Sequence, residues 1–109
     1  MNKLKRAQTE ALFRDVNGRI AESAERFDAD VAEFVCECAD PNCTHRIQTS
    51  LEHYDEVRGE ATHFLLVPGH EDPEIERVVE RHGRHTVVEK FEKVVARMVR
   101  RLDPRTNPA

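Results

Sequence analysis

The chain of 109 residues contains no tryptophan, and aromatic residues make up only 6% of it. Hydrophobic residues account for 39% and charged residues for 35%, which leaves little apolar material for the core of one domain. No apolar run approaches the ~20 residues that a membrane-spanning helix requires. A bound metal ion is a natural supplement to such a core, because its binding free energy adds to the free energy of folding.

The N-terminus lacks the apolar segment of a secretory signal, although its first residues are basic. The three cysteines cannot all pair within one chain, and clustered thiols in an unexported protein favour metal binding over a disulfide framework. We therefore expect a cytoplasmic protein without a membrane anchor.

The net charge of −4 is distributed unevenly along the chain. Residues 30–76 carry two basic and twelve acidic side chains, whereas residues 77–109 carry nine basic and four acidic ones. A nucleic-acid-binding zinc finger would need basic rather than acidic residues around its cysteines. Binding to phosphate would fall to the basic residues near the C-terminus, which are Arg97, Arg100, Arg101 and Arg105. Those arginines are also typical of a solvated helix end.

Helical periodicity marks both ends of the chain. It predicts a helix over residues 3–27, with an apolar face formed by Leu12, Val16, Ile20 and Phe27. It predicts a second helix over residues 90–102, with a stripe formed by Phe91, Val94, Val95, Met98 and Leu102. Residues 1–10 and 103–109 are expected to be loose.

Between these helices the pattern predicts short strands. Residues 33–37 and 46–49 pair around a turn, and a short helix follows, with Thr49 and Glu52 at capping-box spacing and Gly59 as its stop. Residues 64–67 form a buried strand. Residues 73–88 fit either the start of a helix or a hairpin turning at His82-Gly83, and the β-branched residues favour the hairpin.

The most specific feature is a group of three cysteines, Cys36, Cys38 and Cys43. In an extended strand, residues two apart point to the same side, so Cys36 and Cys38 can reach one ion. Cys43 follows the turn at residues 40–42. Three thiolates with this spacing predict a tetrahedral zinc site, the alternative being three small buried hydrophobic side chains.

The fourth zinc ligand is inferred among three possibilities. His70 follows a Pro-Gly turn and would close a long loop, which favours it; His45 is nearer in sequence; and a further group or water would leave the site open. The other histidines, His53, His63, His82 and His85, are expected to be surface or hairpin residues without a role.

Several segments resemble a group of small, uncharacterised bacterial zinc-binding proteins. The likeness lies in residues 10–17, 34–44, 54–58, 67–71 and 76–90, and the part after Lys90 is not matched. The resemblance implies a recurrent Cys-x-Cys-x4-Cys and Pro-Gly-His set, which supports His70 as the fourth ligand. It implies no activity.

These observations predict a single α+β domain, residues 1–109, with a zinc-stapled β-hairpin core flanked by N- and C-terminal amphipathic helices. The predicted function is a small regulatory or protein-interaction module with a structural zinc ion held by Cys36, Cys38, Cys43 and His70. The alternatives are a redox- or metal-responsive zinc switch and a nucleic-acid-associated regulator. A zinc hydrolase using Glu37 or Glu71 as a base is disfavoured, because no H-E-x-x-H or deaminase pattern is present.

Overall fold

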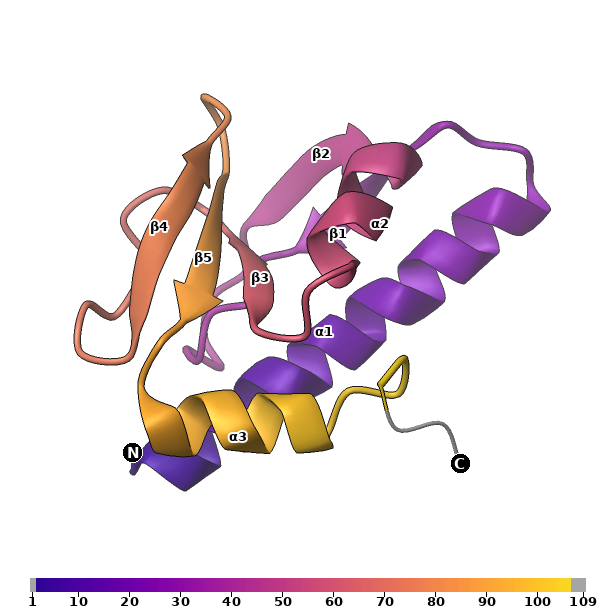
Figure 1. Ribbon diagram of the computed structural model, residues 1–109. Coiled ribbons are helices and arrows are strands. Elements are labelled where there is room, and N and C mark those ends of the chain that lie inside the picture. The colour runs from indigo at the N-terminus through magenta and orange to yellow at the C-terminus, as the bar shows by residue number, and fades with distance from the viewer. Residues whose placement is uncertain (1, 107–109) are drawn as a thin grey trace.

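The computed structural model describes residues 2–106, in which three helices and five strands follow one another (Figure 1). The elements are α1 (Lys3–Arg26), β1 (Val31–Val35), β2 (Arg46–Ser50), α2 (Leu51–Arg58), β3 (His63–Leu66), β4 (Glu76–Arg81), β5 (Thr86–Lys90) and α3 (Lys93–Arg101). None of the helices in residues 2–106 is long and apolar enough to cross a membrane. The α+β class predicted from the sequence is confirmed.

The strands form two antiparallel sheets. In the first, β1 and β2 pair as a hairpin with Phe34 opposite Ile47. In the second, the order is β3-β5-β4, and Phe64 lies opposite Val88. The hairpin interpretation of the ambiguous segment is therefore correct, and its turn contains Gly83 at φ +69°, a conformation that favours glycine. The core is thus a hairpin together with a three-stranded sheet, rather than a hairpin alone.

Helix α2 covers the junction of the two sheets, beside β2 and β3 (Figure 1). Its Tyr54 ring stacks on Phe34 of β1 with ring centroids 4.4 Å apart. The N-cap is Ser50 rather than the expected Thr49, because the Ser50 hydroxyl accepts the hydrogen bond from the His53 N–H at 3.0 Å. The helix ends at Gly59, as predicted.

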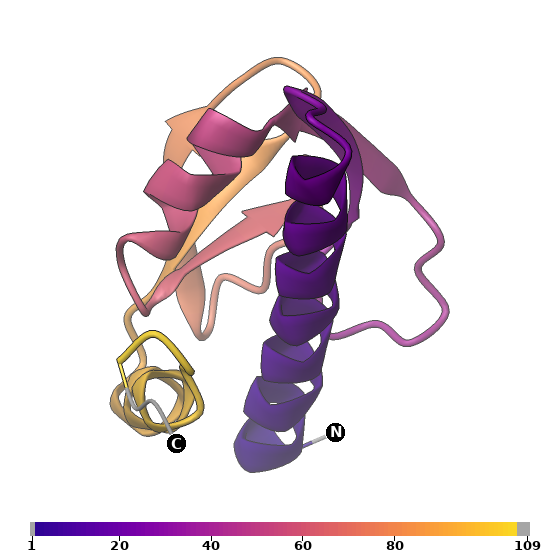
Figure 2. The same ribbon diagram turned by 90° about the vertical axis from the view of Figure 1, so that its right-hand side faces the viewer.

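The N- and C-terminal helices pack on each other, with α3 beside the N-terminal part of α1 (Figure 2). The apolar face predicted for α1 is largely wrong: Ile20 packs against the core, but Leu12 is 59% exposed and Phe27 82% exposed. The buried face of α1 is instead formed by Ala7, Glu10, Ala11, Arg14 and Asn17. Arg14 belongs to this face because it meets backbone carbonyl groups there: it donates hydrogen bonds to the carbonyl oxygens of Ala61 and Val99 at 2.8 and 2.9 Å.

The stripe predicted for the C-terminal helix is also partly wrong. Helix α3 begins at Lys93, after the N-cap Glu92, so Phe91 lies outside the helix and is 43% exposed. The buried residues of α3 are Val95, Ala96 and Val99, whereas Val94 and Leu102 remain exposed. The periodicity was correct, but it could not show which side of the helix meets α1.

Residues 3–10, expected to be loose, form the start of α1. Glu10 is buried and accepts a hydrogen bond from Lys90 of β5, which also donates to Glu76 of β4. Burial raises the pKa of Glu10 to about 7. Near the other end, Asp103 is buried and pairs with Arg58 at 2.8 Å. The expected looseness of residue 1 and of residues 107–109 falls outside the described residues.

Candidate metal centre

The four residues predicted to bind zinc lie together. One ligand atom from each of Cys36, Cys38, Cys43 and His70 falls within 4.8 Å of the other three, and we call this group the Cys3His cluster. The residues come from the segment directly after β1 (Cys36 and Cys38), the turn before β2 (Cys43) and the β3–β4 loop (His70). Segments up to 34 residues apart therefore converge on one point.

The spacing of these atoms fits a zinc ion. The Nδ1 atom of His70 lies 3.6 Å from the Sγ atoms of both Cys36 and Cys43. With Zn–S bonds of about 2.3 Å and Zn–N bonds of about 2.0–2.1 Å, the sulfur–nitrogen edge of a tetrahedron is roughly 3.5 Å. Two edges of the cluster therefore already match those of a tetrahedral zinc site.

The alternation of side chains at the end of β1 places Cys36 and Cys38 together. Both cysteines are buried, and the Cys36 N–H still bonds to the His45 carbonyl at 3.4 Å, which continues the hairpin pairing. Glu37, between them, is fully buried on the other side of the chain. Its N–H donates to the Leu65 carbonyl at 2.8 Å, which joins the hairpin to β3.

The Glu37 carboxylate is held entirely by neighbouring groups. One oxygen accepts hydrogen bonds from the Asn17 amide and the Tyr54 hydroxyl, both at 2.7 Å. The other accepts the Leu65 N–H at 2.9 Å. Burial raises the pKa of Glu37, while these hydrogen bonds oppose that rise. Glu37, named from the sequence as a base for a zinc hydrolase, is thus a buried partner of α1, α2 and β3.

Asn17 is a supporting residue that the sequence analysis missed. Its side chain accepts the Val35 N–H at 2.8 Å and donates to the Val35 carbonyl at 2.9 Å, just before Cys36. The Asn17-Gly18 pair in the middle of α1 could have indicated this role. Asparagine is unfavourable inside a helix unless its side-chain amide has a partner outside the helix. Here that partner is the strand that carries the cysteines.

The other two ligands are presented by tight turns. The Asp40 carboxylate accepts the Asn42 N–H at 2.9 Å, and the Asp40 carbonyl accepts the Cys43 N–H at 3.1 Å. Gly69 adopts φ +89° in the turn before His70, a backbone conformation that favours glycine. The Val67 N–H also points at the Cys36 sulfur, 3.2 Å away, and would stabilise a thiolate there.

His45, the alternative fourth ligand, lies nearby without joining the Cys3His cluster. It is exposed, and its ring packs edge-on against His70 with centroids 5.2 Å apart. The geometry therefore favours His70 as the histidine of a metal site.

The three thiols differ in acidity. A hydrogen bond from Cys36 lowers the pKa of Cys38 to about 5, and the same interaction raises the pKa of Cys36. Burial raises the pKa of Cys43. Three thiolates at this distance repel one another, so a cation is what would hold all three in the deprotonated form.

The arginines considered for nucleic-acid binding do not form one group. Arg97, Arg100 and Arg101 are exposed on α3, whereas Arg105, beyond the helix, pairs with Asp55 of α2 at 2.9 Å. The charge of Arg105 is therefore partly neutralised by an ion pair within the fold.

Comparisons with known proteins identify no relative: no family model matches the chain, and no curated protein or solved structure matches it significantly. The resemblance to small bacterial zinc-binding proteins thus depends on the quoted segments alone.

Proposed function

We propose that this chain is a small protein-interaction module in which one structural zinc ion, bound by Cys36, Cys38, Cys43 and His70, holds the fold together. The observation that carries the metal assignment is the pair of 3.6 Å sulfur–nitrogen distances within a group drawn from three separate segments. Zinc is the preferred ion because thiolate and imidazole ligands in a tetrahedral arrangement suit it best.

The proposed zinc is structural rather than catalytic. Three thiolates and one imidazole fill all four tetrahedral positions, so no position is left for a reactive water molecule. Thiolate charge donation also makes zinc a weak Lewis acid. Cobalt substitution tests this: a four-coordinate visible spectrum that is unchanged by small anions supports a closed site, and a spectrum that responds to them contradicts it.

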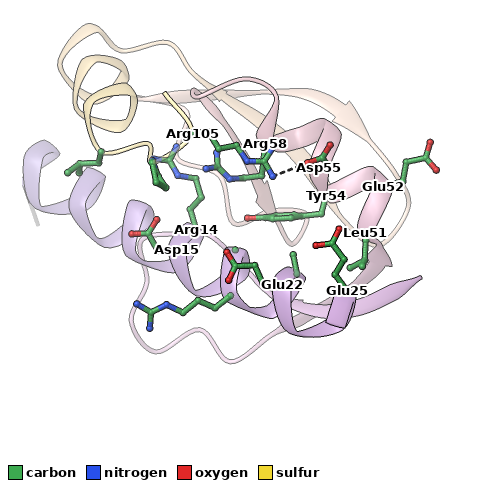
Figure 3. A pocket seen from close by; sticks show the side chains of 15 residues that line it. Arg14, Asp15, Glu22, Glu25, Leu51, Glu52, Tyr54, Asp55, Arg58 and Arg105 are labelled. Carbon is green, nitrogen blue, oxygen red and sulfur yellow. Dashed lines mark ion pairs between the residues drawn. The ribbon is translucent and has the colours of Figure 1, made fainter. Parts of the chain in front are cut away.

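The proposed partner surface is a groove of about 740 Å³ between α1, α2 and the segment after α3. Figure 3 shows Glu22 and Glu25 on the α1 side and Leu51 on the α2 side, with the buried Tyr54 ring forming the floor between them. The exposed Leu102, which follows α3, also lines the groove. The groove therefore combines apolar side chains with charged rims, as protein interfaces do.

The exposed charges around the groove are mostly acidic. Arg14 and Arg58 are buried and bonded within the fold, which leaves Arg19 and Arg105 as the exposed basic residues. The exposed acidic residues are Asp15, Glu22, Glu25, Glu52 and Asp55. Charge complementarity thus favours one class of occupant, a segment of another protein that carries basic and apolar side chains.

A binding titration with a fluorescent amphipathic peptide, lysine and arginine on one face and leucine on the other, tests the proposal. We expect saturable binding, weakened about tenfold or more in the double variant Glu22→Lys/Glu25→Lys, because like charges then meet across the groove. The matched control is Glu33→Lys/Glu74→Lys, which changes the net charge equally at exposed positions outside the groove.

Three results would contradict this function. Equal weakening in the two double variants would mean that the peptide responds only to net charge. Equal binding of an acidic amphipathic peptide would remove the charge argument. Tight, sequence-selective binding of duplex DNA or RNA at near-physiological salt would favour a nucleic-acid-associated role through Arg97, Arg100 and Arg101 instead.

A further inference from the structure

We propose that His53, His82 and His85 form a second metal site, which binds a divalent transition-metal ion reversibly and shares no residue with the Cys3His cluster. One ring nitrogen from each of these residues lies within 4.8 Å of the other two. We call this group the histidine cluster. It involves none of the residues on which the proposed function depends.

The fold brings these histidines together from two elements. His53 lies in the first turn of α2, where its N–H is fixed by the Ser50 hydroxyl. His82 and His85 flank the β4–β5 turn, which is closed by a 2.9 Å hydrogen bond from the His82 N–H to the His85 carbonyl. Figures 1 and 2 show this turn at the same end of the molecule as the start of α2. The backbone at all three positions is therefore held by hydrogen bonds.

The rings already converge at distances near those of a metal site. The Nε2 atoms of His53 and His85 are 3.1 Å apart, and with Zn–N bonds of about 2.0–2.1 Å the edge of a tetrahedron is roughly 3.3 Å. The His82 ring centroid lies 4.5 Å from that of His53 and 4.9 Å from that of His85. The His82 and His85 rings are stacked at an interplanar angle of 18°, so binding of one ion by all three residues requires rotation of at least one of these rings.

The neutral imidazole is the form that binds metals, and the surroundings favour it at His85. Burial, together with the neighbouring His53 and His82, lowers the pKa of His85. Carboxylates beside two of the rings would offset the positive charge of a bound ion: a Glu80 oxygen lies 2.7 Å from Nε2 of His82, and a Glu56 oxygen lies 3.9 Å from Nδ1 of His53. Carboxylates beside ligand histidines are the usual outer partners that orient the rings.

The chemistry of the donors defines the class of ion. Imidazole ligands suit Zn²⁺, Cu²⁺ and Ni²⁺ rather than Mg²⁺ or Ca²⁺, which prefer oxygen. The His82 side chain is 39% exposed, so water can reach the ion and complete its coordination. Occupancy of this site should therefore follow the free metal concentration.

The test uses protein that is purified with an ion already bound in its Cys3His cluster. This protein is titrated with Zn²⁺ in a calorimeter. We expect the wild-type chain to bind one further equivalent. His82→Ala and His53→Ala should each weaken that binding at least about 100-fold, since even the loss of an outer partner costs 10–100-fold. The matched control is His63→Ala, which removes a histidine that contacts Glu89 outside the cluster and should leave both equivalents intact.

NMR spectra identify the ligands independently, because substoichiometric Cu²⁺ or Ni²⁺ broadens the ring signals of the histidines that bind it. Competition between the ions ranks their affinities for the site. We expect broadening first at the rings of the histidine cluster. His82 lies on an exposed turn, so His82→Ala decides the question even if His53→Ala fails to fold. A wild-type chain that binds no further equivalent, or variants that bind it unchanged, would show that the rings make only a hydrogen-bonded stack and would overturn the proposal.

Discussion

The Cys3His cluster and the histidine cluster gather similar numbers of metal-binding side chains, but they differ in charge and burial. Both join segments more than 30 residues apart in sequence, by 34 residues in the first and 32 in the second. In the first, Cys36 and Cys38 are buried, and three thiolates would repel one another without a cation. In the second, the ligands are imidazoles, of which His53 and His85 contact each other at 3.1 Å and His82 contacts Glu80 at 2.7 Å.

We propose that this difference separates a structural site from an exchangeable one. The sequence separation of the ligands does not distinguish the two sites, because both clusters close loops of similar length. Buried thiolates depend on the ion for their charge balance, so removing it destabilises the fold. Imidazoles that hydrogen-bond to neighbouring groups keep those bonds when the ion leaves, so the fold loses little stability. We therefore expect changes at the two clusters to have very different consequences.

Metal removal should have the largest effect. The apparent binding free energy of a structural zinc ion, about 10–16 kcal/mol, matches or exceeds the whole stability of a small domain, about 5–15 kcal/mol. Elemental analysis should give one tightly held zinc per chain, and a strong chelator should abolish the cooperative thermal transition followed by circular dichroism. A metal-free chain that melts like the native protein would refute the structural assignment.

Replacement of the histidine ligand comes next. His70→Ala should cost more than about 3 kcal/mol, because loss of a metal ligand is among the few large destabilising mechanisms. His45→Ala is the matched control, since it removes an exposed histidine next to His70, and should stay within about 0.5 kcal/mol. Thermal melts of both variants compare them directly. A similar loss of stability in the two variants would contradict the assignment of His70, rather than His45, as the fourth zinc ligand.

The support of the Cys3His cluster by α1 should be measurable by itself. Asn17→Ala removes the two bonds to Val35 and the bond to Glu37, and should destabilise the chain by about 3 kcal/mol through buried groups left unpaired. Urea unfolding of zinc-loaded protein gives the value. The exposed Asn42→Ala is the control, expected within about 0.5 kcal/mol. An equally small loss for Asn17→Ala would leave the cysteine strand independent of α1.

The smallest effect should come from His82→Ala. Without added metal its stability should remain within about 0.5 kcal/mol of wild type, because the side chain is partly exposed. With Zn²⁺ at about 100 times its dissociation constant, the wild-type chain should gain about 2.7 kcal/mol that the variant lacks. Paired melts with and without added Zn²⁺ measure this gain. A variant that is stabilised to the same extent would exclude His82 as a ligand.

Local patterns in the sequence predicted most of the secondary structure. Both terminal helices, the hairpin around residues 82–83 and the stop at Gly59 were placed within a few residues. These features depend on periodicity and turn chemistry, which neighbouring residues alone express. The N-cap was misplaced by one residue because Thr49 and Ser50 are both competent caps, and only the direction of the chain leaving β2 chooses between them.

The burial of helix faces could not be predicted in the same way. Leu12 has the right spacing for a core residue but is exposed, whereas Arg14 is fully buried. Arg14 is buried because the carbonyl groups of Ala61 and Val99 meet α1 there and need donors. That requirement belongs to the partner elements and leaves no trace in the periodicity of α1.

The sequence by itself identified the three cysteines of the Cys3His cluster and favoured His70 over His45 as their partner. Cysteines at strand and turn spacing, and a histidine after a Pro-Gly turn, are local signals that each ligand carries in its own segment. The tertiary structure alone decided the supporting roles of Asn17 and Glu37 and the meeting of His53 with the β4–β5 turn. No local spacing relates those residues, because they become neighbours only when α1 and α2 pack against the two sheets.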